Sequence, residues 1–224
     1  AGAEVVVAAR RSDKLAELVT EITAAGGKAH LLAMDVTSAD SVNRAFEQLD
    51  GMIGSLDILV NNAGIGSAPT KFIDLEENEW GNLLEVNLKG AWRVAKQAAI
   101  RMVVAGKGSI INTGSIYSLC TGMRKADYNV SKAALGQLTK NMALELCRAG
   151  IRVNSLCPGY FASPLNEVEF NTERGKAYIA RLVPQRLGQY HELNGPLLLL
   201  ASDAGSYING SALVVDGGSL LSPI

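Results

Sequence analysis

The stretch "EVVVAARRSDKLAELVTEITAAGG" (Glu4–Gly27) combines two kinds of apolar pattern. Its first part, Glu4–Ala9, is a short valine-rich run, which is typical of a parallel strand buried on both faces. From Ser12 onward the apolar residues recur with helical spacing, at Leu15, Leu18, Val19 and Ile22. Gly26 and Gly27 then supply a helix stop. The stretch therefore predicts one strand followed by one amphipathic helix.

The same strand-and-helix unit recurs along the chain with short turns between units. Further strands are expected at Ala29–Val36, Leu56–Gly64, Gly108–Ser115, Ile151–Gly159 and Ser211–Gly218. Further helices are expected from Ser38, over about Glu76–Val104, at Asp127–Ala149 and over about Glu192–Ser202. This alternation predicts an α/β fold with a Rossmann-type doubly wound parallel sheet in three α/β/α layers. The sequence has no internal repeats or linkers, so residues 1–224 are expected to form a single domain.

Residues 160–187 break the alternation, because this segment is long, mixed in character and polar. Ligands of open α/β sheets bind beyond the carboxyl ends of the strands. The segment directly follows a predicted strand, and we therefore expect it to act as a substrate lid.

Composition excludes several classes of protein. The 224 residues are 48% hydrophobic and 19% charged, which is ample for a buried core, and the net charge of −1 argues against nucleic acid as a partner. Cys120, Cys147 and Cys157 lack metal or redox spacing, so we expect free thiols and no metal site. The longest apolar run, Gly195–Ala201, is far too short to span a bilayer, and no signal peptide is visible. These features predict a soluble cytoplasmic protein without a membrane partner.

Candidate functional residues follow the predicted strands. Parallel strands bring their carboxyl ends to one rim of the sheet, where ligands bind. The residues at this rim are Arg10, Arg11, Asp35, Asn61–Gly64, Ser115, Pro158 and Gly159. One further pair, Tyr128 and Lys132 in "YNVSK", lies one helical turn apart on a single face. Spacing alone is weak evidence that this pair is catalytic. The polar residues that converge on the rim make a catalytic role more credible.

Seven short motifs along the chain carry a resemblance to a known family. They are "DVT" (Asp35–Thr37), "NNAG" (Asn61–Gly64), "VNLKG" (Val86–Gly90), "GSIINTGS" ending at Ser115, "YNVSK", "RVNSLCPG" (Arg152–Gly159) and "VDGG" ending at Gly218. Each motif is loose alone, but their order and spacing over nearly the whole chain resemble single-domain short-chain dehydrogenases/reductases.

The resemblance implies four catalytic residues. Tyr128 resembles the general acid that protonates a carbonyl oxygen during reduction. A free tyrosine has a pKa of about 10, so a positive charge on Lys132 is expected to lower it. Lys132 also resembles the anchor of the nicotinamide ribose, and Ser115 the hydroxyl that binds the same carbonyl oxygen. Asn87 resembles the residue that holds a proton-relaying water.

The resemblance also implies a nicotinamide dinucleotide. NAD-preferring members place an acidic residue where this chain has Ala9, and here Arg10 and Arg11 follow, which suit a 2′-phosphate in charge and geometry. NADP(H) is therefore expected, with NAD(H) as the alternative. Asp35 and Val36 resemble adenine contacts, by side chain and by backbone respectively. The remaining contacts implied are Asn62, Ala63 and Gly64 at the adenosine ribose, and Phe161 and Ser163, beyond Pro158 and Gly159, at the carboxamide.

One family feature is absent from the sequence given. The family opens with a strand, a glycine-rich turn and a helix, and no G-x-G-x-x-G occurs here. The first residue is not Met, and Gly2 resembles a helix C-cap. We expect roughly 25–30 leading residues, one strand-turn-helix unit, to precede this sequence. A native truncation is the alternative.

The substrate is the least readable property. Tyr117, Arg124 and Tyr160 are candidate substrate contacts, with Arg124 either pairing with an anion or simply solvated. Leu119 is a further candidate before the catalytic tyrosine, and Phe161, Asn166 and Phe170 are further candidates at the start of the lid. The motifs resemble 3-oxoacyl-(acyl carrier protein) reductases and sugar or polyol dehydrogenases equally, and the fold does not separate them.

Three functions therefore stay open. They are an NADPH-dependent carbonyl reductase, an NAD-dependent sugar or polyol dehydrogenase, and a catalytically silent binding subunit that lacks the phosphate loop. Relatives of this type are usually tetramers or dimers, so a homo-oligomer is expected, with the apolar C-terminal segment "LVVDGGSLLSPI" as a candidate interface.

Overall fold

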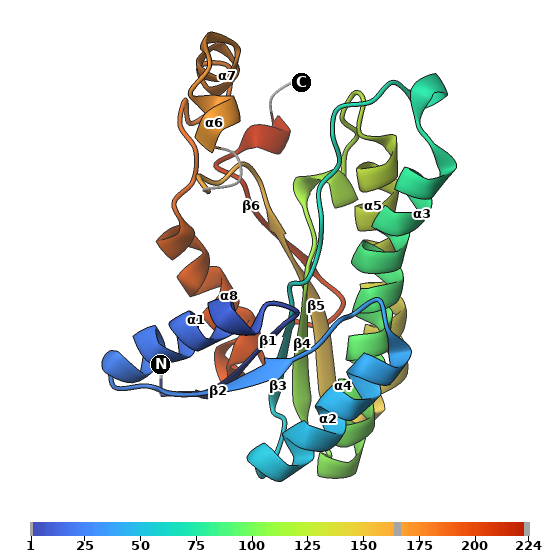
Figure 1. The fold of residues 1–224 in the computed structure, drawn as a ribbon, viewed down its shortest axis with the longest axis vertical. Coiled ribbons are helices and arrows are strands. Elements are labelled where there is room, and N and C mark those ends of the chain that lie inside the picture. The colour runs from blue at the N-terminus through green and yellow to red at the C-terminus, as the bar shows by residue number, and fades with distance from the viewer. Residues whose placement is uncertain (1, 164–166, 222–224) are drawn as a thin grey trace.

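The computed structural model describes residues 2–163 and 167–221. Its strands are β1 (Glu4–Ala9), β2 (Lys28–Ala33), β3 (Ile58–Asn61), β4 (Gly108–Thr113), β5 (Ile151–Pro158) and β6 (Ala212–Val215). Its α-helices are α1 (Ser12–Ala24), α2 (Ala39–Met52), α3 (Glu77–Leu84), α4 (Ala91–Ala105), α5 (Ala126–Leu146), α6 (Glu167–Phe170), α7 (Glu173–Ile179) and α8 (Asn194–Ala201). The alternation of strands and helices expected from the sequence is confirmed (Figure 1).

All the strand pairings are parallel and bring the carboxyl ends to one rim. Strands β3, β4, β5 and β6 form one sheet in sequence order, and β1 pairs with β2. The register places Asn61 beside Asn112 and Thr113 beside Leu156. Residues that follow β3, β4 and β5 are therefore neighbours across the rim, which is the arrangement that the candidate site requires.

Between β1 and β3 the described strands form no pairing, so the sheet is divided there. Three large apolar residues on these strands are more than one-third exposed: Val5 at 37%, Ile58 at 38% and Val60 at 43%. The other pairings follow the doubly wound order.

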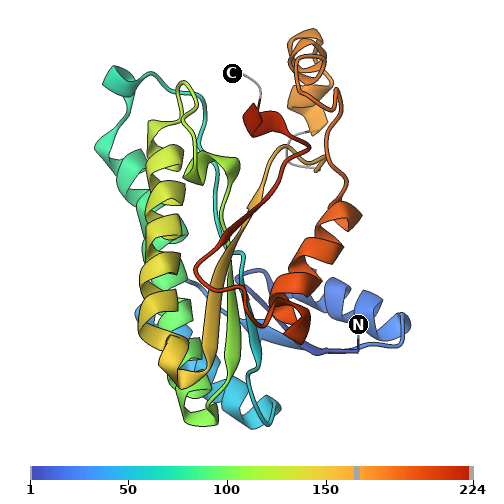
Figure 2. The same ribbon diagram turned by 180° about the vertical axis from the view of Figure 1, so that it is seen from behind.

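Helices cover both faces of the sheet in three layers (Figures 1 and 2). One core lies beneath α2, α4 and α5 and includes Ile110 of β4. The next residue, Ile111, points to the opposite face and packs with Leu156 and Leu200 beneath α8. Successive strand residues face opposite sides, so a run of apolar residues is needed where both sides are covered.

Several element boundaries differ from those expected. The predicted helix at Glu76–Val104 is α3, a π-helical segment at Glu85–Gly90 and then α4. The strand predicted at Leu56–Gly64 is limited to β3, because its pairing with β4 ends at Asn61. The strands predicted at Ala29–Val36 and Ser211–Gly218 likewise reach only Ala33 and Val215. Apolar runs locate strands well, whereas their ends depend on pairing.

The lid segment, residues 160–187, contains α6 and α7 and lies beyond the carboxyl ends of β5 and β6 (Figure 1). Asn166 lies outside the described residues. A parallel bridge joins Phe161 to Gly188, and a Cβ on Gly188 would come within 2.6 Å of the Phe161 ring. The base of the lid is therefore held tightly against the chain that leads to α8.

Candidate functional site

The predicted catalytic tyrosine lies in the first turn of α5. The buried carboxylate of Asp127 accepts hydrogen bonds from the Tyr128 backbone N–H at 2.7 Å and from the Ser67 hydroxyl at 2.9 Å. Asp127 thereby satisfies a free N–H of the helix start and fixes this turn against the loop after β3. Sequence reasoning missed Asp127, although an acidic residue in the first helical turn is a readable signal.

Lys132 is inserted between α5 and the sheet. Its side chain is 6% exposed, and Nζ donates to the backbone oxygen of Thr113 at 2.8 Å. Nζ also lies 5.7 Å from the centroid of the Tyr128 ring, as the helical spacing predicted. Burial lowers the pKa of Lys132 to about 8, while the nearby Cys157 raises it slightly. Near pH 7 the ammonium form therefore still predominates.

Ser115 lies where β4 ends and the 3₁₀ turn Ile116–Ser118 begins. Its hydroxyl accepts from the Tyr117 backbone N–H at 3.2 Å and also hydrogen-bonds the Tyr128 side chain. Burial raises the pKa of Tyr128, and this effect outweighs the lowering by Ser115. The expected lowering of the Tyr128 pKa by Lys132 is therefore wrong for this structure. The physical reason is that burial favours the neutral phenol and the Lys132 ammonium is directed to Thr113.

Asn87 is fully buried within the π-helical segment. Its Oδ1 accepts from the Ile65 N–H at 2.8 Å, and its Nδ2 donates to the Ile65 carbonyl at 2.9 Å. Nδ2 also donates to Ser131 Oγ at 3.2 Å, and Ser131 donates in turn to the Tyr128 carbonyl. Both amide donors are thus used by the protein. The expected water contact would have to use the Asn87 backbone or the second lone pair of Oδ1.

Gly64 connects the "NNAG" turn to these residues. A Cβ on Gly64 would lie 3.2 Å from Asn87 Oδ1 and 3.7 Å from Lys132 Nζ. The resemblance implied a contact of this glycine with the adenosine ribose, and the structure places it next to Asn87 and Lys132. Asn62, Ala63 and Gly64 are all exposed along the rim.

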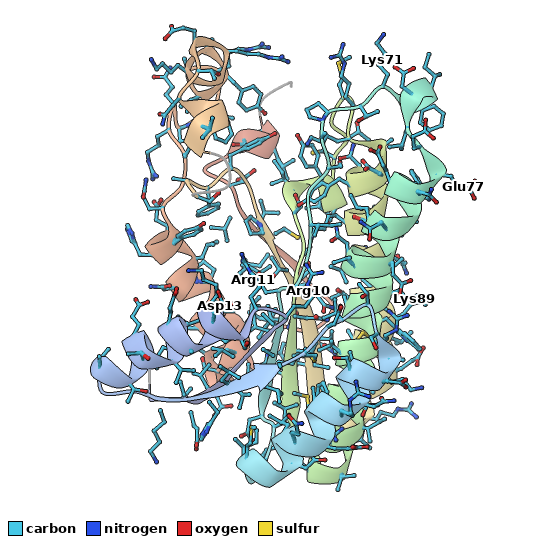
Figure 3. All side chains as sticks on the ribbon, in the orientation of Figure 1. Arg10, Arg11, Asp13, Lys71, Glu77 and Lys89 are labelled. Carbon is cyan, nitrogen blue, oxygen red and sulfur yellow. The ribbon has the colours of Figure 1, made fainter. Side chains whose placement is uncertain are left out.

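Arg10 and Arg11 are exposed at the carboxyl end of β1, and their side chains lie above the sheet (Figure 3). Arg10 is close enough to Asp35 for its charge to lower the pKa of that carboxyl, although hydrogen bonds from Thr37 lower it more. Asp35 Oδ1 accepts from the Thr37 N–H and hydroxyl at 2.9 and 2.7 Å. Val36 packs against Gly90, where a Cβ would come within 2.8 Å of the Val36 side chain.

At the end of β5, Pro158 and Gly159 lead into the lid segment. A Cβ on Gly159 would lie 2.7 Å from the Asp216 side chain, so glycine permits close packing on the "VDGG" turn. Phe161 and Ser163 are half-buried beyond this point. These residues share the rim with Ser115, as expected from the parallel register.

The candidate substrate residues separate into two groups. Tyr117 and Tyr160 meet, with their phenol oxygens 2.6 Å apart, and the Tyr117 ring lies edge-on to Tyr128 at 6.1 Å. Arg124, by contrast, is exposed in a loop with a left-handed φ of 59°. Tyr178 of α7 joins the first group through Tyr160, and sequence reasoning missed it because no motif includes it.

No group of three or more His, Cys, Asp or Glu side chains in residues 2–163 and 167–221 is arranged to hold a metal ion. Within the same described ranges, every helix is too short or too polar to cross a membrane.

Comparisons with known proteins agree with this arrangement. A family model described as enoyl-(acyl carrier protein) reductase matches residues 1–219. Gluconate 5-dehydrogenase of Gluconobacter oxydans is 35% identical over 223 residues, which are 99% of this chain and 86% of that protein. The 3beta-hydroxysteroid dehydrogenase 1 of Eggerthella lenta is 37% identical over 97% of this chain and 85% of its own length.

A solved structure extends the comparison to three dimensions. The crystal structure of a gluconate 5-dehydrogenase from Burkholderia cenocepacia in complex with NADP and tartrate superposes with a TM-score of 0.94. It is 35% identical, and the match covers 99% of this chain and 87% of that one. The Rossmann-type single-domain fold predicted from the sequence is thereby confirmed. The chain belongs to the short-chain dehydrogenase/reductase family of oxidoreductases.

Proposed function

We propose that the protein transfers a hydride between NADP(H) and a carbonyl compound or secondary alcohol, with Tyr128 as general acid and base. The observation that carries this proposal is the meeting of Ser115, Tyr128 and Lys132 at the carboxyl end of β4. A proton donor and a second hydroxyl directed to one point are the groups that carbonyl reduction requires.

The residues along the rim fit a nicotinamide dinucleotide. When bound, this cofactor supplies or accepts the hydride. Gly64 leaves space beside the Lys132 ammonium that a side chain would fill, and Lys132 is the proposed partner of the nicotinamide ribose. Arg10 and Arg11 are the proposed partners of the 2′-phosphate. The other proposed contacts are Asp35, Val36, Asn62, Ala63, Pro158, Gly159, Phe161 and Ser163.

The protonation states suit reduction near neutral pH. Burial raises the pKa of Tyr128, so the phenol keeps the proton that a carbonyl oxygen needs. Ser115 hydrogen-bonds the same phenol and would orient that oxygen. Lys132, with a pKa of about 8, keeps its positive charge near neutral pH, and its ammonium is the proposed partner of the cofactor's nicotinamide ribose.

Two alternatives are separated by simple measurements. The first is an NAD-dependent sugar or polyol dehydrogenase. Relatives named gluconate 5-dehydrogenase favour its substrate class, although one of them was crystallised with NADP, and the ratio of kcat/KM for NAD and NADP tests its cofactor. A catalytically silent binding subunit would show no turnover with either cofactor. We further propose that the lid segment covers the substrate, with Tyr117, Tyr160 and Arg124 as candidate contacts, and that the protein is a cytoplasmic homo-oligomer.

The first test is Tyr128→Phe, which removes only the phenol oxygen. General acid catalysis contributes roughly 10²–10⁴-fold, and turnover should fall by that factor while NADPH binding persists. The matched control is Tyr207→Phe, at a fully exposed tyrosine before β6. Wild-type turnover in Tyr128→Phe would overturn the assignment of Tyr128.

A further inference from the structure

Aromatic residues from three separate segments meet beside Tyr128. Tyr117 comes from the 3₁₀ turn after β4, Tyr160 follows β5, and Phe170 and Tyr178 belong to α6 and α7. We refer to these four residues as the tyrosine wall. The Tyr117 and Tyr160 hydroxyls are 2.6 Å apart, and Tyr160 also hydrogen-bonds Tyr178. The wall therefore joins the lid segment to the catalytic side of the sheet.

Ring contacts make the wall continuous. Tyr160 packs edge-to-face on Tyr178 at 5.3 Å and on Phe170 at 6.2 Å, measured between ring centroids. Tyr117 contacts the Tyr128 ring in the same geometry at 6.1 Å. Edge-to-face packing is the preferred arrangement of aromatic pairs. A substrate at the Tyr128 hydroxyl would lie near the Tyr117 ring, the residue of the wall that contacts Tyr128.

The polar atoms of the wall are already engaged with one another. Tyr160 shares hydrogen bonds with both Tyr117 and Tyr178, and burial raises the pKa of Tyr160 and Tyr178, so both stay neutral. Hydroxyls that satisfy each other offer few free partners to a polyhydroxylated ligand. A carboxylate placed here would lose hydration without an ion partner in the wall.

Tyr160 shares a pocket with Arg186, Glu192 and Asp216, and these charged side chains already have partners. Arg186 and Glu192 form an ion pair at 2.7 Å, and Asp216 accepts backbone hydrogen bonds from Gly218 and Leu220.

Leu119 and Met123, in the loop that joins Tyr117 to α5, are exposed apolar residues. Arg181 is a cation whose charge acts on Tyr178, but its own side chain is exposed and it is a minor influence beside burial. An anion held by Arg181 would therefore be bound at the surface and not against the rings.

We propose that the tyrosine wall selects an uncharged ring compound, an alicyclic or aromatic secondary alcohol or its ketone, over an open-chain sugar acid. This inference rests on the proposed function. Oxidation of such an alcohol breaks one C–H and one O–H bond, sends the hydride to NADP⁺ and releases one proton through Tyr128. Aromatic walls gain most from ligands with flat apolar surfaces, because burial of that surface drives binding.

The first experiment compares cyclohexanol with gluconate as substrates of the full chain with NADP⁺. We expect kcat/KM to be at least about tenfold higher for cyclohexanol, since a few apolar carbons in a fitted pocket supply that difference. A ratio that favours gluconate would overturn the inference and leave the proposed oxidoreductase function intact.

Variants of Tyr160 then test whether the tyrosine wall causes the preference for cyclohexanol over gluconate. In Tyr160→Ala, the KM for cyclohexanol should rise by about tenfold through lost ring contact. Tyr160→Phe keeps the ring, so it should retain the preference for cyclohexanol even if Tyr160→Ala folds poorly. Tyr207→Ala, the exposed control, should match the wild type. An unchanged KM in Tyr160→Ala would refute the role of the wall.

A binding measurement separates this inference from the proposed reaction. Cyclohexanone should raise the Tm of Tyr128→Phe in the presence of NADPH, and the Tyr160→Ala substitution should abolish this rise. If no alcohol is oxidised by the wild type but the Tyr160-dependent rise is observed, the proposed function fails and the ligand class stands. If gluconate raises the Tm and cyclohexanone does not, the ligand class is wrong.

Discussion

Lys132 donates a hydrogen bond from Nζ to the backbone oxygen of Thr113 at 2.8 Å. Thr113 is the last residue of β4, so this bond joins helix α5 to the sheet two residues before Ser115. The lysine is almost fully buried and its pKa falls to about 8. Its position therefore makes Lys132 a tie between two layers as well as the proposed partner of Tyr128.

The depressed pKa of Lys132 predicts that stability rises with pH. Between about pH 8 and 10.5 the unfolded chain binds more protons at this residue than the folded chain, so the free energy of unfolding increases across that window. Below pH 8 the cost of burying the charge is present in full. At 1.36 kcal/mol per pKa unit the effect is about 3 kcal/mol.

Urea unfolding of the wild type and of Lys132→Met at pH 7 and pH 10 tests this dependence. The variant should lose most of the rise that the wild type shows between the two pH values. Lys140→Met, at an exposed lysine of the same helix, is the control and should keep the rise. An equal rise in wild type and Lys132→Met would show that Lys132 titrates as an ordinary surface lysine.

The Lys132 ammonium also predicts how the rate of reduction depends on pH. The pKa of Tyr128 is raised, so its phenol remains protonated at pH 8, whereas Lys132 loses its charge there. The kcat/KM for NADPH should therefore decrease as pH rises through about 8, because this parameter reports groups of the free enzyme. In Lys132→Arg the charge persists, and the decrease should move to higher pH.

Measured profiles of kcat/KM from pH 6 to 10 decide this point, with NADPH fluorescence on binding as the readout if the variant turns over slowly. A profile that is identical in wild type and Lys132→Arg would assign the decrease to another group.

Cofactor preference should depend on Arg10. Arg10→Asp replaces a cation by a carboxylate at the proposed 2′-phosphate position. Hydrogen bonds to charged groups contribute about 1.5–3 kcal/mol, so kcat/KM for NADPH should fall by roughly tenfold to a hundredfold while that for NADH is kept or improved. Arg148→Asp makes the same charge change at an exposed site before the amino end of β5. An unchanged cofactor ratio in Arg10→Asp would remove Arg10 from the proposed site.

Asn87 should matter for stability as well as turnover. Asn87→Ala leaves the Ile65 N–H and carbonyl without their partner and frees Ser131 Oγ from its donor. A buried polar group left unpaired costs about 1–3 kcal/mol, and the free energy of unfolding should decrease by at least that amount. Asn43→Ala, which removes one exposed hydrogen bond to Gln97, provides the comparison in chemical denaturation. Equal losses in the two variants would argue against a structural role of the Asn87 amide.

Much of the fold was predictable because its information is local. Short apolar runs such as Glu4–Ala9 mark strands, although β1 is largely exposed here and not buried on both faces as its sequence predicted. Periodic apolar residues such as those of Ser12–Ala24 mark helices. The interruption of the predicted Glu76–Val104 helix was not predictable. A π-helical segment has no apolar period of its own, and here it serves to place Asn87 against the Ile65 backbone.

The candidate site likewise has features that the sequence predicts and features that it does not. The helical spacing of Tyr128 and Lys132 and the strand-end position of Ser115 are properties of the sequence, because helix geometry and parallel pairing fix them. Only the tertiary structure decides three other features of the site. They are the upward shift of the Tyr128 pKa, the hydrogen bond from Lys132 to Thr113, and the contact of Tyr117 with Tyr160 and Tyr178. Burial and contacts between segments far apart in the chain depend on how the layers pack, and no local pattern encodes them.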